Sequence, residues 1–440
     1  MRDIFVTLVV FGSLPFILRR PWIGIIMWGW LSYMNPHKQA WGFATDMPFA
    51  LMVALCTLVG MLFSREPKRI PWTRETVLLL VFVLWMVMTT FFALNPIGAW
   101  QQLDKIWRIQ LMTFVTLMLI TSRVRVEALV WIICLSLGYY GIKGGIFTIT
   151  TGGVHRVYGP AHTFIGGNNE LALALIMIIP LMRYLQLQSG QAWIRIGLGG
   201  AMLLSAVAAI GSQSRGAFLA IMAMGAFLWL KSRHKLATGL LGLVAVIAVL
   251  LLMPEQYYDR MTTIRTYDQD ASAMGRINAW WTAYNLARDR PLVGGGFDVL
   301  LMRWIFHVYS PNPEHVVDVH SIYFEVLGEH GFVALAMFLM LWIFSWFTAQ
   351  RVIRATRADP ERRWLADLCA MLQVSLVGYL AGGAFLGLAY FDLPYHLLAI
   401  VVIASRLAQQ PVVAQQATGA SLADGAARGG RMLPEPAASR

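Results

Sequence analysis

Charged side chains and cysteines are scarce in this sequence. Only 13% of the 440 residues are charged and 58% are hydrophobic, with a mean hydropathy of +0.60. A soluble globule of this length needs more polar side chains to cover its surface, so the composition predicts a chain solvated by lipid. The three cysteines, Cys56, Cys134 and Cys369, lie within apolar runs without paired spacing or a metal-ligand pattern, and we interpret them as packing residues.

Apolar runs long enough for a membrane helix, roughly 17–25 residues, recur along nearly the whole chain. Helices satisfy their own backbone hydrogen bonds in lipid, so we predict an all-α polytopic membrane protein with about 12 crossings. The first run follows Arg2 like a signal peptide, but it has no cleavage site, and its orientation stays open as a half-span or re-entrant segment. The expected spans are Ile4–Leu18, Trp22–Met34, Met47–Phe63, Thr76–Leu94, Ile106–Ile120, Ala128–Phe147, Glu170–Leu187, Ile196–Gly211, Gly216–Leu230, Leu236–Met253, Ile322–Phe347, Leu365–Tyr390 and Leu393–Leu407.

Basic residues outnumber acidic ones, 35 to 23, and much of the excess lies in short loops between the expected spans. The positive-inside rule explains this excess as membrane topology, so we expect no nucleic-acid partner. The loops expected in the cytoplasm are those around residues 19–20, 65–74, 123–125, 231–235 and 350–363. The loops expected on the opposite side are residues 35–46, 95–104, 148–169, 212–215 and 254–320.

Three regions follow from this pattern: an N-terminal transmembrane region (1–150), a core (151–408) and a disordered cytoplasmic tail (409–440) rich in Ala, Gly, Pro, Gln and Arg. The core contains one long loop, Pro254–His320, and long loops in compact proteins are often functional. Its aromatic residues and a helical pattern that ends before a proline predict an interfacial helix, Ala273–Asp289, that roofs a cavity between spans.

Three arginines are candidates for binding phosphate. Arg215 interrupts two apolar runs, where an arginine usually faces a cavity, although it could also reach the membrane interface as a snorkelling side chain. Arg276 and Arg288 lie on the expected loop helix, and guanidinium groups match the geometry of a diphosphate. A basic face beside lipid headgroups is the alternative for these two. The run Gly294–Gly296 lacks the strand, helix and lysine of a nucleotide-binding loop.

His320 ends the long loop where the next span begins, and a neutral imidazole there could take a proton from a substrate hydroxyl. Asp318 and Glu325 could orient it, and a structural role is the alternative. His330 is expected to pack within the following span. The other histidines that we considered are loop residues without fixed partner spacing: His155, His162, His307 and His315.

Three motifs resemble, in order and spacing, the O-antigen ligase and polymerase superfamily. The resemblance covers roughly Val154–Ala404, and the region with Met34-Asn-Pro-His37 is similar to the N-terminal extension of ligase-type members, including exosortase-associated O-glycosylation ligases. The motifs are Ser214-Arg-Gly-Ala217, Arg276 with Trp280 ahead of Pro291-Leu-x-Gly-x-Gly-Phe297, and His320-Ser-x-Tyr-Phe-Glu-x-Leu-Gly-Glu-x-Gly331, with Arg156-Val-Tyr-Gly159 and Asn168-Asn-Glu-Leu171 upstream.

The resemblance implies a fold like that of C-type glycosyltransferases and an active site on the periplasmic face of the bacterial inner membrane. The donor would be a glycan on undecaprenyl diphosphate, and the acceptor lipid A-core. By motif, His320 would be the catalytic histidine and Arg215 and Arg276 the essential arginines, while we expect Arg156 and Arg288 to bind substrate. The family's chemistry implies inverting transfer without a cofactor, nucleotide sugar or metal.

Other functions stay open from sequence. An O-antigen polymerase or a protein O-glycosylation ligase would use the same donor with a different acceptor. A transporter or flippase for lipid-linked sugars would need paired repeats with interrupted helices, and the sequence shows one large asymmetric loop instead.

Overall fold

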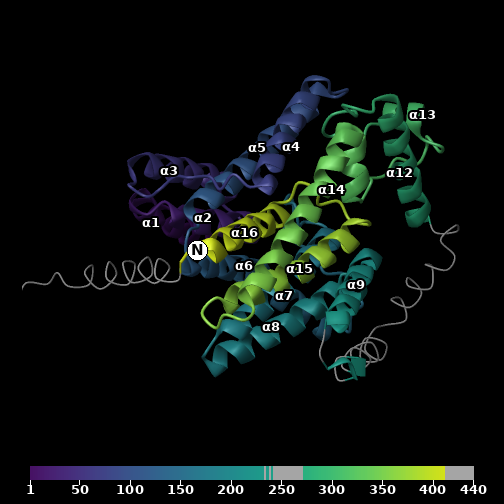
Figure 1. The fold of residues 1–440 in the computed structure, drawn as a ribbon. Helices are drawn as coiled ribbons and strands as arrows, with labels where there is room; N and C mark the ends of the chain where they lie inside the picture. The colour runs from purple at the N-terminus through teal and green to yellow at the C-terminus, as the bar shows by residue number, and fades with distance from the viewer. Residues whose placement is uncertain (232–233, 237–238, 241–270, 412–440) are drawn as a thin grey trace, which may run out of the picture.

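The computed structural model describes residues 1–231, 234–236, 239–240 and 271–411, and throughout these ranges the regular structure is helical (Figure 1). This confirms the all-α class. The helices are α1 (Arg2–Arg19), α2 (Trp22–Gly29), the short turns η1 (Trp30–Met34), η2 (Pro36–Gln39) and η3 (Phe43–Asp46), α3 (Phe49–Phe63), α4 (Arg74–Phe91), α5 (Pro96–Leu119), α6 (Arg123–Thr150), α7 (Asn168–Gln188), α8 (Ala192–Gly211), α9 (Arg215–Lys231), α12 (Ala271–Asp289), α13 (Arg303–Tyr309), α14 (Ile322–Thr356), α15 (Arg363–Gly383) and α16 (Asp392–Gln409).

Six of the described helices are long and apolar enough to cross a membrane, namely α4, α6, α7, α8, α14 and α15, and α3 is a shorter apolar helix. The protein is therefore a polytopic membrane protein by helix length and composition. The total of about 12 crossings stays a prediction. Most of the expected span Leu236–Met253, residues 254–270 of the long loop and the tail from residue 412 lie outside the described residues.

Several boundaries differ from the sequence prediction, and three of them change how a loop is described. Residues 96–104, expected in a loop, form the first turns of α5, because Pro96 suits the first helical position and the Asn95 side chain accepts a hydrogen bond from the Gly98 N–H (3.3 Å). α14 continues past Phe347 to Thr356, so the expected loop 350–363 is helical in its first half. α15 ends at Gly383 and leaves residues 384–391 as a connecting segment.

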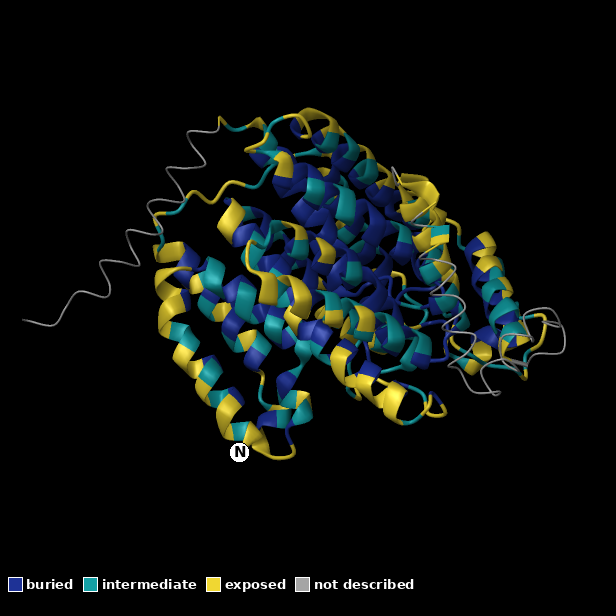
Figure 2. Cartoon of the chain, turned by 90° about the horizontal axis from the view of Figure 1, so that it is seen from below, coloured by how far each residue is buried: buried dark blue, intermediate teal, exposed yellow. Residues whose placement is uncertain are grey.

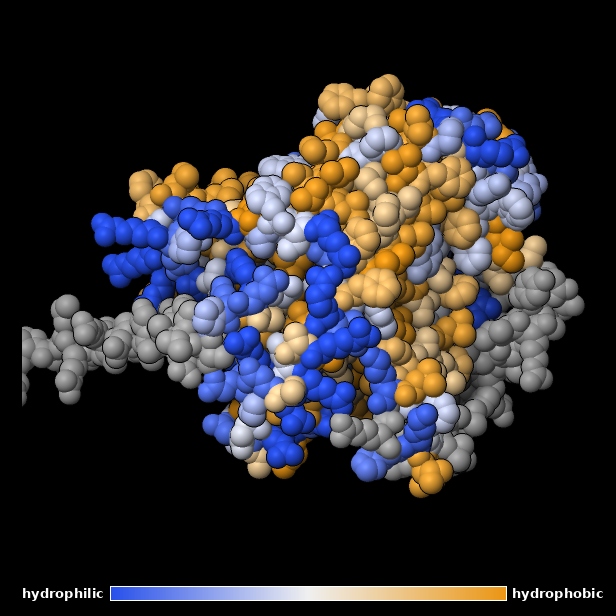
Figure 3. Space-filling view, in the orientation of Figure 1, coloured by the Kyte–Doolittle hydropathy of each residue, from blue (hydrophilic) through white to orange (hydrophobic). Residues whose placement is uncertain are grey.

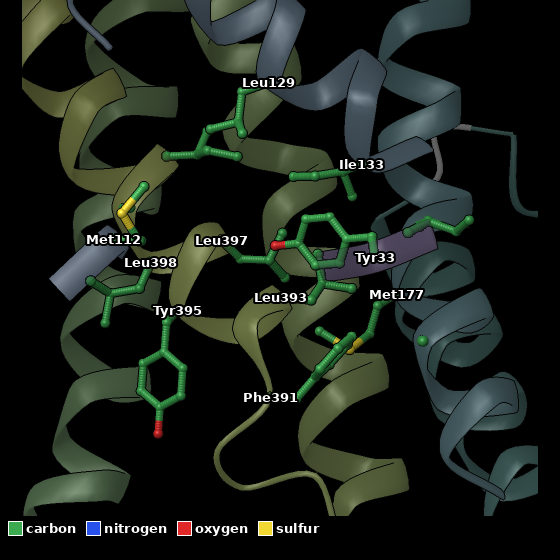
Figure 4. Close-up of a cluster of buried hydrophobic side chains, with 14 of the residues drawn as sticks. Tyr33, Met112, Leu129, Ile133, Met177, Phe391, Leu393, Tyr395, Leu397 and Leu398 are labelled. Atoms are coloured by element: carbon green, nitrogen blue, oxygen red, sulfur yellow. The ribbon is translucent and has the colours of Figure 1, made fainter. Parts of the chain in front are cut away.

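The centre of the molecule is built from α7, α15 and α16 (Figure 1), and buried residues gather in the middle of the fold (Figure 2). The most apolar stretch of α7 is 72% buried, whereas that of the peripheral helix α8 is 28% buried. Figure 4 shows the α16 side chains Leu393, Leu397 and Leu398 among side chains of α5, α6 and α7. The N-terminal region and the core region thus share one buried interior.

The outer helices expose many large apolar side chains, such as Leu62 (77%), Leu84 (57%) and Leu203 (66%). Exposed apolar surface on this scale is expected where helices face lipid. Figure 3 shows apolar residues across the middle of one face, with hydrophilic residues gathered at the upper right and toward the bottom. The exposed surface therefore agrees with a membrane-spanning body that has two polar ends.

Loops that the sequence assigns to one side lie together in the structure. At one end, Arg125 makes a bidentate ion pair with Glu66 (2.6 and 2.8 Å), and Arg406 donates to the carbonyl of Ile120 (2.9 Å). At the other end, the Leu94 N–H donates to the carbonyl of Gly295 (2.8 Å). The pairing of loops agrees with the expected topology, while the compartment that each end faces stays a prediction.

The glycine run before Phe297 docks the long loop onto α14. The N–H groups of Gly295 and Gly296 donate to the carbonyls of Gly328 (2.9 Å) and Glu329 (2.7 Å). Just beyond, α14 is kinked at Gly331, whose φ of 78° is a conformation that favours glycine. This docking role agrees with the prediction that the run does not form a nucleotide-binding loop.

Candidate functional site

A cavity of about 410 Å³ lies beneath the start of α12. It is built by three segments: the first turn of α7, the first turns of α12 and the stretch that leads into α14. The structure therefore brings Arg276 and His320, which the sequence proposed from separate motifs, to one cavity. Its lining residues are Asn169, Ser272, Arg276, His315, Val317 and His320.

Helix α12 ends before Pro291 as predicted, and Asn278 joins it to the stretch 310–315. The Asn278 amide donates to the carbonyls of Asn312 (2.8 Å) and His315 (3.1 Å). Its oxygen accepts from the Ser310 hydroxyl (2.8 Å) and the Asn312 N–H (2.9 Å). The side chain is buried and uses its full hydrogen-bonding capacity, so it fixes this stretch against α12.

Trp280 fixes the backbone on both sides of His320. Its indole N–H donates to the carbonyl of Val319 (2.8 Å), and its ring stacks on Phe324 with centroids 5.2 Å apart. His320 itself has a φ of 41°, a left-handed conformation that costs a non-glycine residue about 1–3 kcal/mol. The contacts of Trp280 hold this strained residue at the wall of the cavity.

Two carboxylates face the imidazole of His320. Its Nδ1 lies 3.4 Å from Oδ2 of Asp318 and 3.9 Å from Oε1 of Glu170, and the His320 side chain is 30% exposed. The charge of Arg276 also acts on the Glu170 carboxylate, so these four ionisable groups form one electrostatic cluster. The expected role of Asp318 beside His320 agrees with this geometry.

Glu325, the other expected neighbour, contacts the connecting segment, and its carboxylate also interacts electrostatically with Asp318 and Glu170. Its Oε2 accepts from the Ala389 N–H (3.3 Å). The same segment passes next to the site, because a Cβ built on Gly387 would lie 3.9 Å from the Cα of His320. Nearby, burial and then the negative charge of Glu329 raise the pKa of Tyr390 well above its usual value, so its hydroxyl stays protonated and donates to Glu329 (2.7 Å).

Arg215 begins α9 and is half-buried. The adjacent Gly216 packs against Phe385 and Leu386 of the connecting segment. The next residue of that segment, Gly387, lies close to His320. On its other side, Asn168 of α7 donates to the carbonyl of Ser212 (2.8 Å). Arg215 is thus placed between two segments that lead to the cavity, although it is not one of its lining residues.

The two arginines expected to bind substrate are not among the residues that line the cavity. Arg156 is half-buried in the loop before α7, next to Val157, whose N–H donates to the carbonyl of Gly211 (3.3 Å). Arg288 is exposed near the end of α12, about 18 Å along the helix axis from Arg276. The structure brings neither of them to the cavity lining.

Sequence reasoning gave no role in the site to four polar residues, although the first two lie in the upstream motif that resembles the family: Asn169, Glu170, Ser272 and His315. The position of His315 along the chain indicates no partner for it. It reaches the cavity because Asn278 holds this part of the loop against α12. His307 is expected in a loop, but the structure places it within the helix α13.

His330 packs as expected. It is fully buried, its Nδ1 is 2.7 Å from the Thr89 hydroxyl, and its ring meets that of Phe297 edge-on at 4.3 Å. Within the described ranges, no group of three or more His, Cys, Asp or Glu side chains is arranged to hold a metal ion.

The fold and the cavity define a polytopic helical membrane protein in which a loop helix covers a site with arginine, histidine and carboxylate groups. Residues 200–339 match the model of the O-antigen ligase family, and residues 1–189 match that of a family of unknown function (DUF5935). The chain therefore contains an O-antigen ligase domain, and the resemblance of its motifs to that superfamily is confirmed. No curated protein matches the chain. Arg215, Arg276 and His320 all lie within the ligase domain.

We predict that Asn278→Ala releases the stretch 310–320 while the helical body stays folded. The substitution removes the hydrogen bonds that Asn278 makes with Ser310, Asn312 and His315, each of which contributes about 0.5–1.5 kcal/mol. Hydrogen–deuterium exchange should become faster at residues 310–320 and stay unchanged in α7 and α15. Asn285→Ala is the matched control, because Asn285 makes one such bond, to the carbonyl of Tyr309 (2.9 Å). Equal exchange in both variants would contradict the role of Asn278.

Proposed function

We propose that this protein is a ligase-type glycosyltransferase that moves a glycan from undecaprenyl diphosphate to lipid A-core at the periplasmic face of the inner membrane. The observation that carries the proposal is the single cavity that joins Arg276 and His320 within an O-antigen ligase domain. A cavity of about 410 Å³ has the size of a small-molecule site, large enough for the reacting ends of the two substrates.

The proposed reaction is a direct displacement at the anomeric carbon. The acceptor hydroxyl attacks this carbon and forms the new glycosidic bond, while the bond to the diphosphate breaks and undecaprenyl diphosphate leaves with the electron pair. His320 takes the hydroxyl proton on Nε2, because Nδ1 faces the carboxylates of Asp318 and Glu170. These carboxylates orient the ring and stabilise its protonated form.

Arginine charge assists the departure of the diphosphate. Arg276 lines the cavity, and Arg215 begins α9 beside Gly216, which packs on the connecting segment next to His320. A guanidinium offers two parallel donors to phosphate oxygens, and fixed positive charge lowers the barrier where negative charge develops. On this basis the two arginines bind the departing diphosphate and His320 serves the acceptor, which gives the site a donor side and an acceptor side.

Substitution of His320 tests the proposal most simply. The purified protein is given an undecaprenyl-diphosphate glycan with lipid A-core or a candidate acceptor protein, and mass spectrometry detects which acceptor gains the glycan. We expect the glycan on lipid A-core, with His320→Gln and His320→Ala both reducing transfer roughly 10²–10⁴-fold, since neither can take the proton.

His307→Gln is the control, because His307 is exposed on α13. Near-normal transfer by His320→Gln would rule out the proton-accepting role. A gain of mass on the protein acceptor, or polymerisation of the donor glycan alone, would replace lipid A-core as the acceptor.

We expect Arg276→Lys to lose most transfer activity although its charge is kept, because a point charge cannot replace two parallel hydrogen bonds to a diphosphate. Arg303→Lys provides the control, since Arg303 is exposed on α13 outside the cavity lining. Both variants are compared with wild type for donor KM and kcat at equal protein levels. Full activity of Arg276→Lys, or an equal loss in Arg303→Lys, would contradict diphosphate binding by Arg276.

A further inference from the structure

A second cavity, of about 420 Å³, lies near the other end of α14, far from His320. It is lined by Arg74 at the start of α4 and by Phe347, Gln350, Arg351 and Arg354 on α14. Three arginines from two candidate spans therefore line one cavity. None of these residues takes part in the proposed transfer reaction.

Arg74 is held in place by several contacts. Its Nε pairs with Oε1 of Glu75 (3.0 Å), and one terminal nitrogen donates to the Thr348 hydroxyl (3.2 Å). Its guanidinium also lies over the ring of Phe344, 4.6 Å from the ring centre. Arg351 and Arg354 are exposed on α14. Glu75 is the carboxylate that pairs with Arg74. The three arginines therefore give the cavity an excess of positive charge, which attracts an anion.

Apolar residues extend from this cavity along both helices. Val77 (45%), Val81 (44%) and Leu84 (57%) are exposed at helical spacing on α4. On α14 the exposed side chains are Met340 (38%), Ile343 (49%) and Phe347 (57%), the last of which also lines the cavity. Charged groups at the end of an apolar strip match a ligand with a phosphate headgroup and hydrocarbon chains.

We infer that this cavity binds the phosphate of an anionic phospholipid, with the acyl chains lying along α4 and α14. The lipid would belong to the leaflet at the end opposite the His320 cavity, which the Lys/Arg pattern predicts to be cytoplasmic. A soluble phosphate compound would use the arginines but gain nothing from the apolar strip. The inference does not depend on the proposed glycosyl transfer.

Native mass spectrometry of the detergent-purified protein tests this site. Phosphatidylglycerol is compared with phosphatidylethanolamine of the same acyl chains and with glycerol 3-phosphate. We expect saturable binding of phosphatidylglycerol, weaker binding of phosphatidylethanolamine and no retained glycerol 3-phosphate. The double variant Arg351→Gln/Arg354→Gln should bind phosphatidylglycerol roughly tenfold more weakly, because each basic group contributes to attraction of an anionic lipid.

Arg357→Gln is the matched control, since Arg357 is exposed just after α14 and outside the cavity lining. Thermal unfolding in detergent alone should be equal for the three proteins, because the substituted side chains are exposed. Unchanged phosphatidylglycerol binding in the double variant would overturn the inference, as would an equal loss in Arg357→Gln. Equal affinity for phosphatidylethanolamine would show that the negative charge is not recognised, and retained glycerol 3-phosphate would indicate a site for soluble phosphates.

Discussion

The candidate site depends on the contact between α12 and the stretch that leads into α14. Asn278 and Trp280 make this contact through the backbone, at residues 312–319, while small residues such as Ala279 and Ala283 let α12 pack closely on its neighbours. Arg276 lies two residues before Asn278. His320 directly follows Val319, whose carbonyl accepts a hydrogen bond from Trp280. The same contact therefore sets the position of both groups. A shift of α12 by one residue would separate the guanidinium from the imidazole.

Polar groups inside the helical body join parts of the chain that are distant in sequence. The Tyr33 hydroxyl and His396 Nδ1 are 2.7 Å apart, and Thr89 and His330 make a similar contact. In lipid an unpaired polar group costs several kcal/mol, so these pairs strongly favour one arrangement of the helices. They also tie the region that matches a family of unknown function to the ligase domain and to α16. The site is thus supported by helices outside the ligase domain itself.

Much of the fold could be predicted from the sequence because long apolar runs and their breaks are local signals. The loop helix from residue 273 to Asp289 was recognisable from its helical pattern and from Pro291, which follows it. The start of α5 was not recognisable, because the polar residues of its first turns resemble those of a loop. Arg276 and His320 were found through motifs. Glu170 lies in the upstream motif Asn168-Asn-Glu-Leu171, but its approach to His320, like that of His315 to the cavity, depends on tertiary contacts that spacing along the chain does not express.

The arrangement of donor and base can be observed directly. A cryo-electron microscopy structure of the protein with a non-hydrolysable undecaprenyl-diphosphate glycan would locate the diphosphate and the anomeric carbon. The account predicts phosphate oxygens within hydrogen-bonding distance of Arg276, and the anomeric carbon on the side of the cavity that His320 faces. A diphosphate bound away from α12, with His320 remote from the sugar, would contradict it.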